Sequence, residues 1–216
     1  MWSTDMITIA IAKGRLQDAA LGLFARAHIE IGADELASRR LAIGDRSGRY
    51  RFIFVKPADV PVYVEHGIAD CGVVGRDVLM ESDADLLVPL DLQIGNCRLI
   101  VAGRGPEPLS NFGMLRVATK YPRLAASHFG ERGIPVEIIQ LSGSVELAPV
   151  LGLADCIVDL METGRTLKEN GLIVTGEIAE SSGRFVVNRA SYQLKSEAIA
   201  ELIKELSGAL SKEVPK

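Results

Sequence analysis

The sequence predicts an α/β fold with two lobes, each built on a mostly parallel β-sheet that is covered by helices. Short apolar, strand-like runs alternate with amphipathic helical patterns along almost the whole chain, which is typical of parallel sheets covered on both faces. The loop 103–113 holds two prolines and three glycines, and a new strand–helix series follows it, so this loop is the candidate for a change of lobe. With 216 residues, the chain is long enough for one domain or two small lobes.

In the first half of the chain, the apolar run 7–12 predicts a buried strand, and the apolar stripe in 15–27 predicts an amphipathic helix. Residues 49–55 alternate between polar and apolar side chains and follow a turn sequence, which indicates a hairpin with the segment before that turn. A helix is expected over 59–67, with Asp59 as its N-cap. The remaining elements of this half are strands over 71–75, 86–92 and 97–103 and a helix that begins at 76.

The second half repeats the alternation and ends in an amphipathic helix over 197–210. A glycine at position 152 is placed to end the second helix of this half. The expected strands are 116–120, 136–141, 154–160, 172–178 and 184–190, and the expected helices before the last one are 121–133, 144–152 and 165–171.

Composition excludes several classes of protein. The chain is 48% hydrophobic, yet no apolar run reaches the roughly 20 residues that span a bilayer, and the N-terminus does not resemble a secretory signal. A net charge of −4 argues against a general nucleic-acid binder. The three cysteines are widely spaced in apolar surroundings, which favours reduced thiols, a cytoplasmic location and no zinc site.

One segment after the predicted strand 154–160 concentrates residues that bind phosphate and sugar. Free backbone N–H groups at a helix start attract an anion, glycine lets the backbone approach a phosphate, and threonine hydroxyls add donors. Carboxylates repel phosphate, so they indicate ribose hydroxyls or a magnesium ion as a second partner. An N-capped helix preceded by a strand-end acid explains the same residues without a ligand. These residues are Asp159, Glu162, Thr163, Gly164, Arg165 and Thr166.

Three further segments are candidates for an anion site. Lys13, Gly14 and Arg15 follow the first strand, at the strand end where open α/β sheets bind ligands, although a tight turn with exposed basic residues explains them equally. A second amide-rich helix start is expected at Gly143 and Ser144, where Glu146 would simply favour the helix dipole. An arginine at position 98 leads an otherwise apolar strand, where a surface position is the alternative.

Other catalytic chemistries lack support in the sequence. The three histidines at 28, 66 and 128 share no metal-ligand spacing. There is no G-x-S-x-G motif, and no cysteine has an obvious histidine partner, so a covalent nucleophile is not expected.

Together these residues resemble the ATP phosphoribosyltransferase family, whose enzymes catalyse the first step of histidine biosynthesis. The resemblance runs from about residue 7 to residue 210. Its carriers are Lys13-Gly14-Arg15-Leu16, Asp59-Val60-Pro61 with Glu65 and Gly67, Ala69-Asp70, Gly75 with Asp77, Asn96-Cys97-Arg98-Leu99, Lys120-Tyr121-Pro122, Gly143-Ser144-Val145-Glu146, Ala154-Asp155, Asp159 and Thr163-Gly164-Arg165-Thr166-Leu167. Two positions depart from the family pattern: Ala12 replaces its usual proline, and Lys56 replaces an arginine, which keeps the charge but loses the bidentate fork.

The resemblance implies a fold similar to type II periplasmic binding proteins. Lobe I would hold residues 1–95 and 183–216, and lobe II would hold residues 96–182. The lobes would face a cleft, with residues 97–103 and 184–190 as the crossing strands. The chain resembles the short form of the family, which works with a separate regulatory subunit similar to histidyl-tRNA synthetase, as a homodimer within a hetero-octamer.

The implied reaction joins N1 of the ATP adenine to C1 of 5-phosphoribosyl 1-pyrophosphate (PRPP) and releases pyrophosphate. Mg²⁺ would be carried by the substrate phosphates, with no site made by protein ligands alone. Residues 159 and 162–166 would bind PRPP, and Arg15 and Lys56 would be the catalytic residues. The implied ATP-binding residues are Lys13, Gly14, Arg15, Asp70, Arg98, Gly143, Ser144 and Glu146.

Two other functions remain open at this point. A non-catalytic two-lobe solute-binding or effector-sensing domain fits the composition and the alternation equally well. It does not need the acid-Thr-Gly-x-Thr loop. A phosphosugar-binding regulator would keep the loop but lack ATP chemistry.

Overall fold

A computed structural model describes residues 6–105 and 113–211 of the chain. The chain divides into two compact units, Met1–Gly95 with Ser182–Lys216 (unit 1) and Asn96–Ser181 (unit 2). The chain therefore passes between the units at 95/96 and 181/182. The prediction that the loop 103–113 marks a change of lobe is wrong, because the strands before and after this loop both belong to unit 2; its residues 106–112 lie outside the described part.

Unit 1 contains a six-stranded sheet with the strand order β2-β3-β1-β4-β11-β5. The strands β1, β3, β4 and β5 run in one direction, whereas β2 and β11 run in the other. Its elements in chain order are β1 (Ile7–Ala12), α1 (Gln17–Arg26), α2 (Ala33–Leu36), β2 (Ala42–Gly44), β3 (Tyr50–Val55), α3 (Asp59–Glu65), β4 (Cys71–Gly75), α4 (Arg76–Ser82), β5 (Leu87–Asp91), β11 (Gly183–Val187), α8 (Arg189–Leu194) and α9 (Ser196–Ser211).

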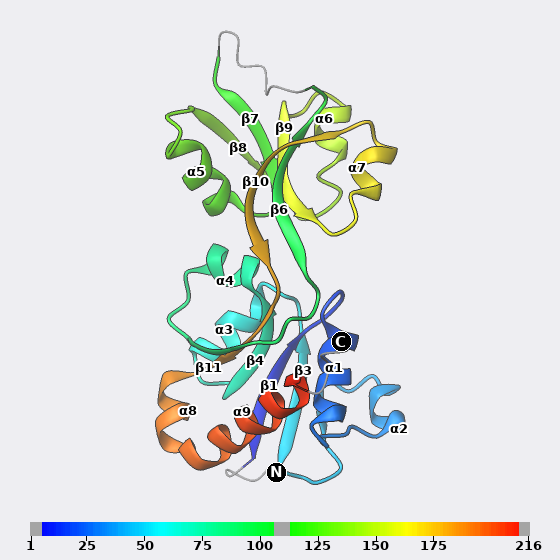
Figure 1. The fold of residues 1–216 in the computed structure, drawn as a ribbon, viewed down its shortest axis with the longest axis vertical. Coiled ribbons are helices and arrows are strands. Elements are labelled where there is room, and N and C mark those ends of the chain that lie inside the picture. The colour runs from blue at the N-terminus through cyan, green and yellow to red at the C-terminus, as the bar shows by residue number, and fades with distance from the viewer. Residues whose placement is uncertain (1–5, 106–112, 212–216) are drawn as a thin grey trace. The chain divides into compact units, whose positions relative to one another are not determined.

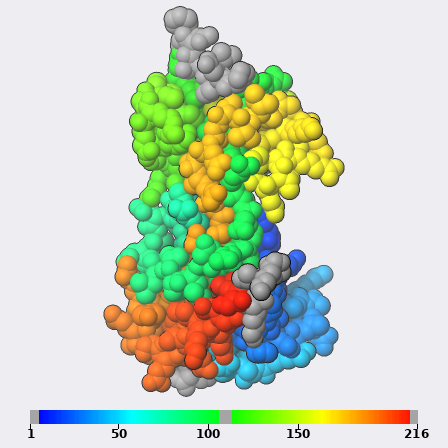
Figure 2. Space-filling model, viewed as in Figure 1, coloured from blue at the N-terminus to red at the C-terminus, as the bar shows by residue number. Residues whose placement is uncertain are grey.

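Helices cover both faces of the unit 1 sheet (Figure 1). The helices α1 and α9 pack on one face, where Phe24, Phe52 and Leu202 are almost completely buried. The helices α3 and α4 pack on the other face, around Val60 and Val74. The helix α9 packs against α1, on the face of unit 1 seen in Figure 2, so the two separate parts of the chain share one core.

Unit 2 contains a five-stranded sheet with the strand order β10-β6-β9-β7-β8. The strand β6 runs in the opposite direction to the other four strands of this sheet. The helix α5 packs on one face around Phe129, and α6 and α7 pack on the other around Val145 and Leu167 (Figure 1). Its elements are β6 (Cys97–Gly103), β7 (Leu115–Thr119), α5 (Pro122–Gly130), β8 (Val136–Gln140), α6 (Leu147–Val150), β9 (Cys156–Met161), α7 (Arg165–Glu169) and β10 (Ile173–Ser181).

The two antiparallel strands β6 and β11 are the first strands after each passage of the chain between the units. Within unit 1, β1, β3, β4 and β5 share a direction, and within unit 2, β7, β8, β9 and β10 do, so in each sheet the C-terminal ends of these strands lie at one edge. The predicted two-lobed α/β fold is confirmed, but both sheets are mixed rather than mostly parallel: unit 1 has two parallel and three antiparallel strand pairs, and unit 2 has two of each.

Several local predictions differ from the structure. The cap position of α3 is Ala58, and Asp59 is the first helical residue. The strand expected over 184–190 ends at Val187, because Asn188 accepts a hydrogen bond from the backbone N–H of Ser191 and starts α8. The helix expected from 144 begins only at Leu147. The short helix α2 was not foreseen, since it buries none of its residues and so leaves no apolar pattern.

None of the helices in the described part of the chain is long and apolar enough to cross a bilayer.

Candidate functional site

The C-terminal edge of the unit 1 sheet collects basic residues. Lys13 follows β1 and Lys56 follows β3, and these strands pair in parallel with Ala12 opposite Val55. The backbone N–H of Lys13 continues this ladder by donating to the Val55 carbonyl at 2.8 Å. The register therefore places the two exposed lysines at neighbouring strand ends, at the edge where open α/β sheets bind ligands.

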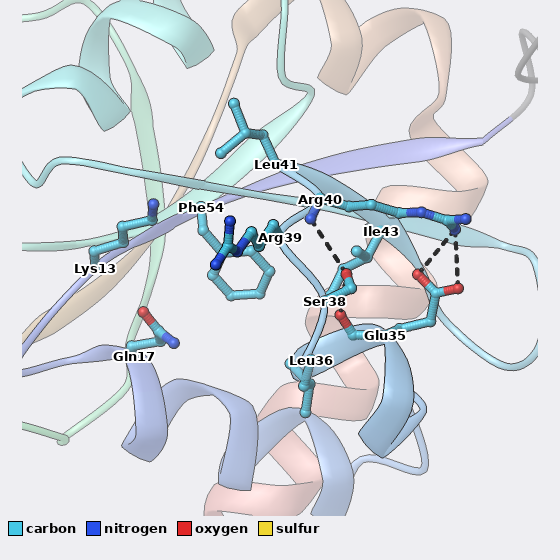
Figure 3. A pocket seen from close by; sticks show the side chains of 10 residues that line it. All are labelled: Lys13, Gln17, Glu35, Leu36, Ser38, Arg39, Arg40, Leu41, Ile43 and Phe54. Carbon is cyan, nitrogen blue, oxygen red and sulfur yellow. Dashed lines mark hydrogen bonds and ion pairs between the residues drawn. The ribbon is translucent and has the colours of Figure 1, made fainter.

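A pocket of about 200 Å³ opens beside Lys13 within unit 1 (Figure 3). Its lining comes from the residue after β1, the start of α1, the end of α2 and the segment after it, β2 and the end of β3. Two arginines that the sequence reasoning missed, Arg39 and Arg40, line it together with Lys13. The Ser-Arg-Arg sequence was a signal for them, but it follows a helix that the apolar pattern did not reveal.

The two arginines differ in their partners. The Arg40 guanidinium donates to the Glu35 carboxylate at 3.1 Å, and Figure 3 shows it turned towards that residue. Arg39 lies on the side of Lys13 and Phe54 in the same view and makes no ion pair within the described residues. Arg39 and Lys13 are therefore the cations that remain available to an anion in this pocket.

Arg15 lies after the left-handed turn at Gly14, where φ is +88°. Its guanidinium donates a hydrogen bond to the carbonyl of Gly95 and lies 3.9 Å from the Asp77 carboxylate. Both partners belong to unit 1, and both follow sheet strands that end at the same edge as β1.

Asp70 does not lie at this edge. It precedes β4, next to Thr8 at the beginning of β1, and its carboxylate accepts hydrogen bonds from the Thr8 N–H, the Ser191 hydroxyl and the Lys195 ammonium at 2.8, 2.8 and 3.0 Å. These three donors connect β1, α8 and the start of α9. The buried Asp70 therefore connects the C-terminal helices to the sheet, and within unit 1 it lies at the opposite end of the strands from Lys13, Gly14 and Arg15.

At the corresponding edge of unit 2, Asp159 lies next to a lysine from the neighbouring strand. The Lys120 ammonium is 3.6 Å from the Asp159 carboxylate, whose side chain is only 13% exposed. Burial raises the pKa of Asp159, the Lys120 charge opposes that rise, and the nearby Glu146 carboxylate adds to it. The segments 143–146 and 159–166, which were predicted separately, therefore lie close together here. Lys120 lies beside them; it belongs to the family pattern but was not predicted as a site residue.

The loop after β9 turns sharply at Gly164. This residue has φ +75° and ψ 4°, a left-handed conformation that favours glycine, and an added Cβ would lie 3.2 Å from the Met161 sulfur. Glu162, Thr163, Arg165 and Thr166 are exposed around the turn.

The helix α7 that follows spans only Arg165–Glu169, so its dipole is short and the loop itself supplies most of the anion-binding groups. The first N–H groups of this helix have no intrahelical acceptor. Arg165 extends to Glu169, with 2.7 Å between its Nε and the carboxylate oxygen. Its guanidinium is thus paired along the helix.

The remaining predicted residues lie at the same edge of unit 2. Gly143 and Ser144 are exposed after β8, with Ser144 at φ +46°. Arg98 pairs in register with Met161, immediately before the loop, and its guanidinium is 3.0 Å from the Glu177 carboxylate.

Within the described residues, no group of three or more His, Cys, Asp or Glu side chains could hold a metal ion. Residues 159–166, from the end of β9 to the start of α7, are called the loop 159–166. This loop offers carboxylate and hydroxyl oxygens, the donor type that Mg²⁺ prefers when it also keeps phosphate oxygens in its shell.

Comparison with known proteins places this architecture. Residues 56–208 match the HisG family, described as ATP phosphoribosyltransferase. The chain belongs to this family. It is 50% identical over 202 residues to the ATP phosphoribosyltransferase of Geobacillus sp. strain WCH70, covering 94% of this chain and 98% of that protein.

Two solved structures show the same fold. The ATP phosphoribosyl transferase (HisG:HisZ) complex from Thermotoga maritima contains a chain that is 34% identical, with a TM-score of 0.85 over 96% of this chain and all of that one. The VFT2 domain of Bordetella pertussis BvgS is 13% identical, with a TM-score of 0.58 over 97% of this chain and 93% of that one, and it supports the fold alone.

Replacing Asp70 with asparagine should destabilise the fold by about 2 kcal/mol, because the half-buried Lys195 ammonium loses its charge partner. The amide oxygen of asparagine can still accept a hydrogen bond from Thr8 or Ser191. Urea unfolding of Asp70→Asn measures this loss, and the KM for ATP should stay within about twofold of the wild type. A tenfold rise in that KM with unchanged stability would return Asp70 to the binding site.

Replacing Asp159 with asparagine should stabilise the protein at neutral pH, because the folded state no longer holds a desolvated charge. The pKa of Asp159 is higher in the folded than in the unfolded state, so this group favours folding most below the ordinary aspartate pKa of about 3.9. This contribution to stability is lost as the pH rises through the raised pKa of the folded state. The unfolding free energy of Asp159→Asn minus that of the wild type should therefore increase from pH 4 to pH 7.

Asp155→Asn is the matched control. The Arg116 guanidinium, which donates to the Asp155 carboxylate, lowers the pKa of that group, so Asp155 favours folding above the ordinary aspartate pKa. Its replacement should cost more stability as pH rises, the opposite sign. Curves of the same slope for the two variants would contradict the assignment of Asp159.

Proposed function

We propose that the chain joins N1 of the ATP adenine to C1 of PRPP with release of pyrophosphate, and that the loop 159–166 binds the phosphoribosyl group. Membership of the ATP phosphoribosyltransferase family supports the reaction. The observation that carries the binding assignment is the left-handed Gly164 between the strand β9 and the helix α7, with the exposed Thr163 and Thr166 hydroxyls around it and the Asp159 carboxylate near the end of the strand. A solute-binding domain for neutral ligands does not need this combination.

The residues of the loop take separate tasks. The amides and hydroxyls of 163–166 hold the 5′-phosphate, since they are donors on an exposed turn. Asp159 and Glu162 accept hydrogen bonds from the ribose hydroxyls. Lys120 favours the ionised form of Asp159 against the cost of burial, and so keeps it an acceptor.

The basic edge of unit 1 takes the other charges. Lys13, Arg39 and Lys56, with Arg15, neutralise the triphosphate of ATP and the departing pyrophosphate. Their gathering around one pocket and one strand edge supports this role. Adenine N1 already has a lone pair, so as the C1–N1 bond forms and the C1–O bond to pyrophosphate breaks, no base must remove a proton first. Orientation and fixed charge then supply most of the rate.

Members of the family use a divalent metal ion, and we assign Mg²⁺ to this chain, carried by the substrate phosphates. When bound, it would neutralise phosphate charge, with Asp159 and Glu162 as the nearest protein carboxylates in the loop. For ATP, Gly14, Arg98, Gly143, Ser144 and Glu146 stay predicted contacts.

We also propose that the chain is the short form, which works as a homodimer within a hetero-octamer with a regulatory subunit similar to histidyl-tRNA synthetase. The likeness to a chain of the Thermotoga maritima HisG:HisZ complex supports a partner of this kind. A cytoplasmic location is supported by the three free, buried cysteines.

Thr166→Ala and Gly164→Ala should each raise the KM for PRPP at least tenfold, the first by removing a hydroxyl donor and the second by straining a left-handed turn. Steady-state formation of phosphoribosyl-ATP, followed in the near ultraviolet with Mg²⁺ and the regulatory partner present, measures this.

Thr175→Ala is the matched control for this loop, because its hydroxyl donates to the Val101 carbonyl of the same unit, away from residues 159–166. Its kinetics should stay within about twofold of the wild type. Kinetics near wild type for both loop variants would contradict the phosphate assignment.

Arg39→Ala should raise the KM for ATP or lower kcat by about tenfold or more, because it removes a cation from the pocket beside Lys13. The neighbouring Arg40→Ala is the control, since Arg40 is paired with Glu35. Equal effects of the two replacements would show that only the net charge of the segment matters.

A further inference from the structure

Arg15 lies against two groups that restrict its side chain from different sides. One terminal nitrogen of its guanidinium donates to the carbonyl of Gly95, and the other lies 3.9 Å from a carboxylate oxygen of Asp77. The Asp77 side chain is 3% exposed, whereas that of Arg15 is 29% exposed. A buried carboxylate thus lies behind an arginine that still reaches solvent.

Two glycines lie against the side chains of this pair. Gly95 has φ +57°, and an added Cβ would collide with the Leu16 side chain and lie 2.9 Å from an Arg15 guanidinium nitrogen. At Gly75, an added Cβ would collide with the Asp77 carboxylate itself. Two glycines at the edge of the unit 1 sheet therefore give the space that the guanidinium and the carboxylate occupy.

We propose that Asp77 is a positioning residue for Arg15: with the Gly95 carbonyl, it holds the guanidinium in one orientation before substrate binds. This inference rests on the proposed role of Arg15 in the use of ATP. A long arginine side chain loses rotamer entropy when it is fixed, and ordering it before the ligand binds lowers that cost for the ligand. The guanidinium has five N–H donors, so contacts with Gly95 and Asp77 leave others for a phosphate.

The buried position of Asp77 also explains why a carboxylate can lie near a phosphate-binding arginine without competing for it. Asp77 is the second residue of α4 and lies in the interior of unit 1, while Arg15 carries the exposed surface. The carboxylate therefore orients the arginine from behind.

A double-mutant cycle in the full chain with its regulatory partner tests this inference. Asp77→Asn keeps the shape and removes the charge, and it should raise the KM for ATP about tenfold with a smaller change in kcat. In the Arg15→Ala background the same replacement should change that KM less than twofold. Asp77→Glu should restore part of the lost affinity. Asp155→Asn, which breaks another arginine–carboxylate pair, should show no coupling to Arg15.

The results distinguish the role of Arg15 in ATP use from the positioning of Arg15 by Asp77. If Arg15→Ala is impaired but Asp77→Asn has the same effect with and without Arg15, Asp77 does not act through Arg15 and the positioning role is overturned. If Arg15→Ala uses ATP like the wild type, the role proposed for Arg15 fails and the positioning role fails with it. Where Asp77→Asn does not fold, as judged by circular dichroism, Gly95→Ala takes its place, because its Cβ displaces the same guanidinium; additive effects there would overturn the inference equally.

Discussion

The left-handed turn at Gly164 is the constraint on which the PRPP assignment depends. It lies between the end of β9 at Met161 and a helix of five residues, and Thr163, Arg165 and Thr166 are exposed around it. The strand holds Asp159 in a largely buried place beside Lys120. The segment 159–166 therefore supplies both hydrogen-bond donors for a phosphate and acceptors for ribose hydroxyls. Its turn requires the left-handed conformation of Gly164, which residues with a Cβ rarely adopt.

Strand direction explains how separate segments supply one chemistry. In each unit the strands that share a direction end at the same edge of the sheet, and the charged residues follow those ends. The chain is acidic as a whole, with a net charge of −4, yet Lys13, Arg15, Arg39 and Lys56 gather on unit 1. Local focusing of positive charge is what an enzyme needs when its two substrates are both polyanions.

Much of the fold could be predicted from the sequence, because the spacing of the apolar residues and the positions of the turn residues agree with the final packing. The run 97–103 and the tail helix are examples, since each has a clear apolar pattern: the first is an inner strand of the unit 2 sheet, and the second packs on a face of the unit 1 sheet. The change of unit could not be predicted from composition. A Pro- and Gly-rich loop resembles a linker, whereas the chain passes between the units at 95/96 and at 181/182, where the composition does not change in this way.

The candidate site was predictable where residue type alone indicates chemistry, as in residues 159–166. It was less predictable where only the fold decides. Asp70 looked like a ligand residue in the family pattern, but the return of the C-terminal helices brings Ser191 and Lys195 to it. Arg39 lies in a segment without periodicity, so only the pocket identifies it. Lys120 gains its place beside Asp159 from parallel pairing of β7 with β9.

A crystal structure of the chain with PRPP and Mg²⁺ would show which residues hold the phosphoribosyl group. We expect the 5′-phosphate on the backbone amides and hydroxyls of 163–166, with the ribose hydroxyls on Asp159 and Glu162. A PRPP molecule bound elsewhere in the chain, with this loop making no contact to its phosphate or ribose, would contradict this expectation.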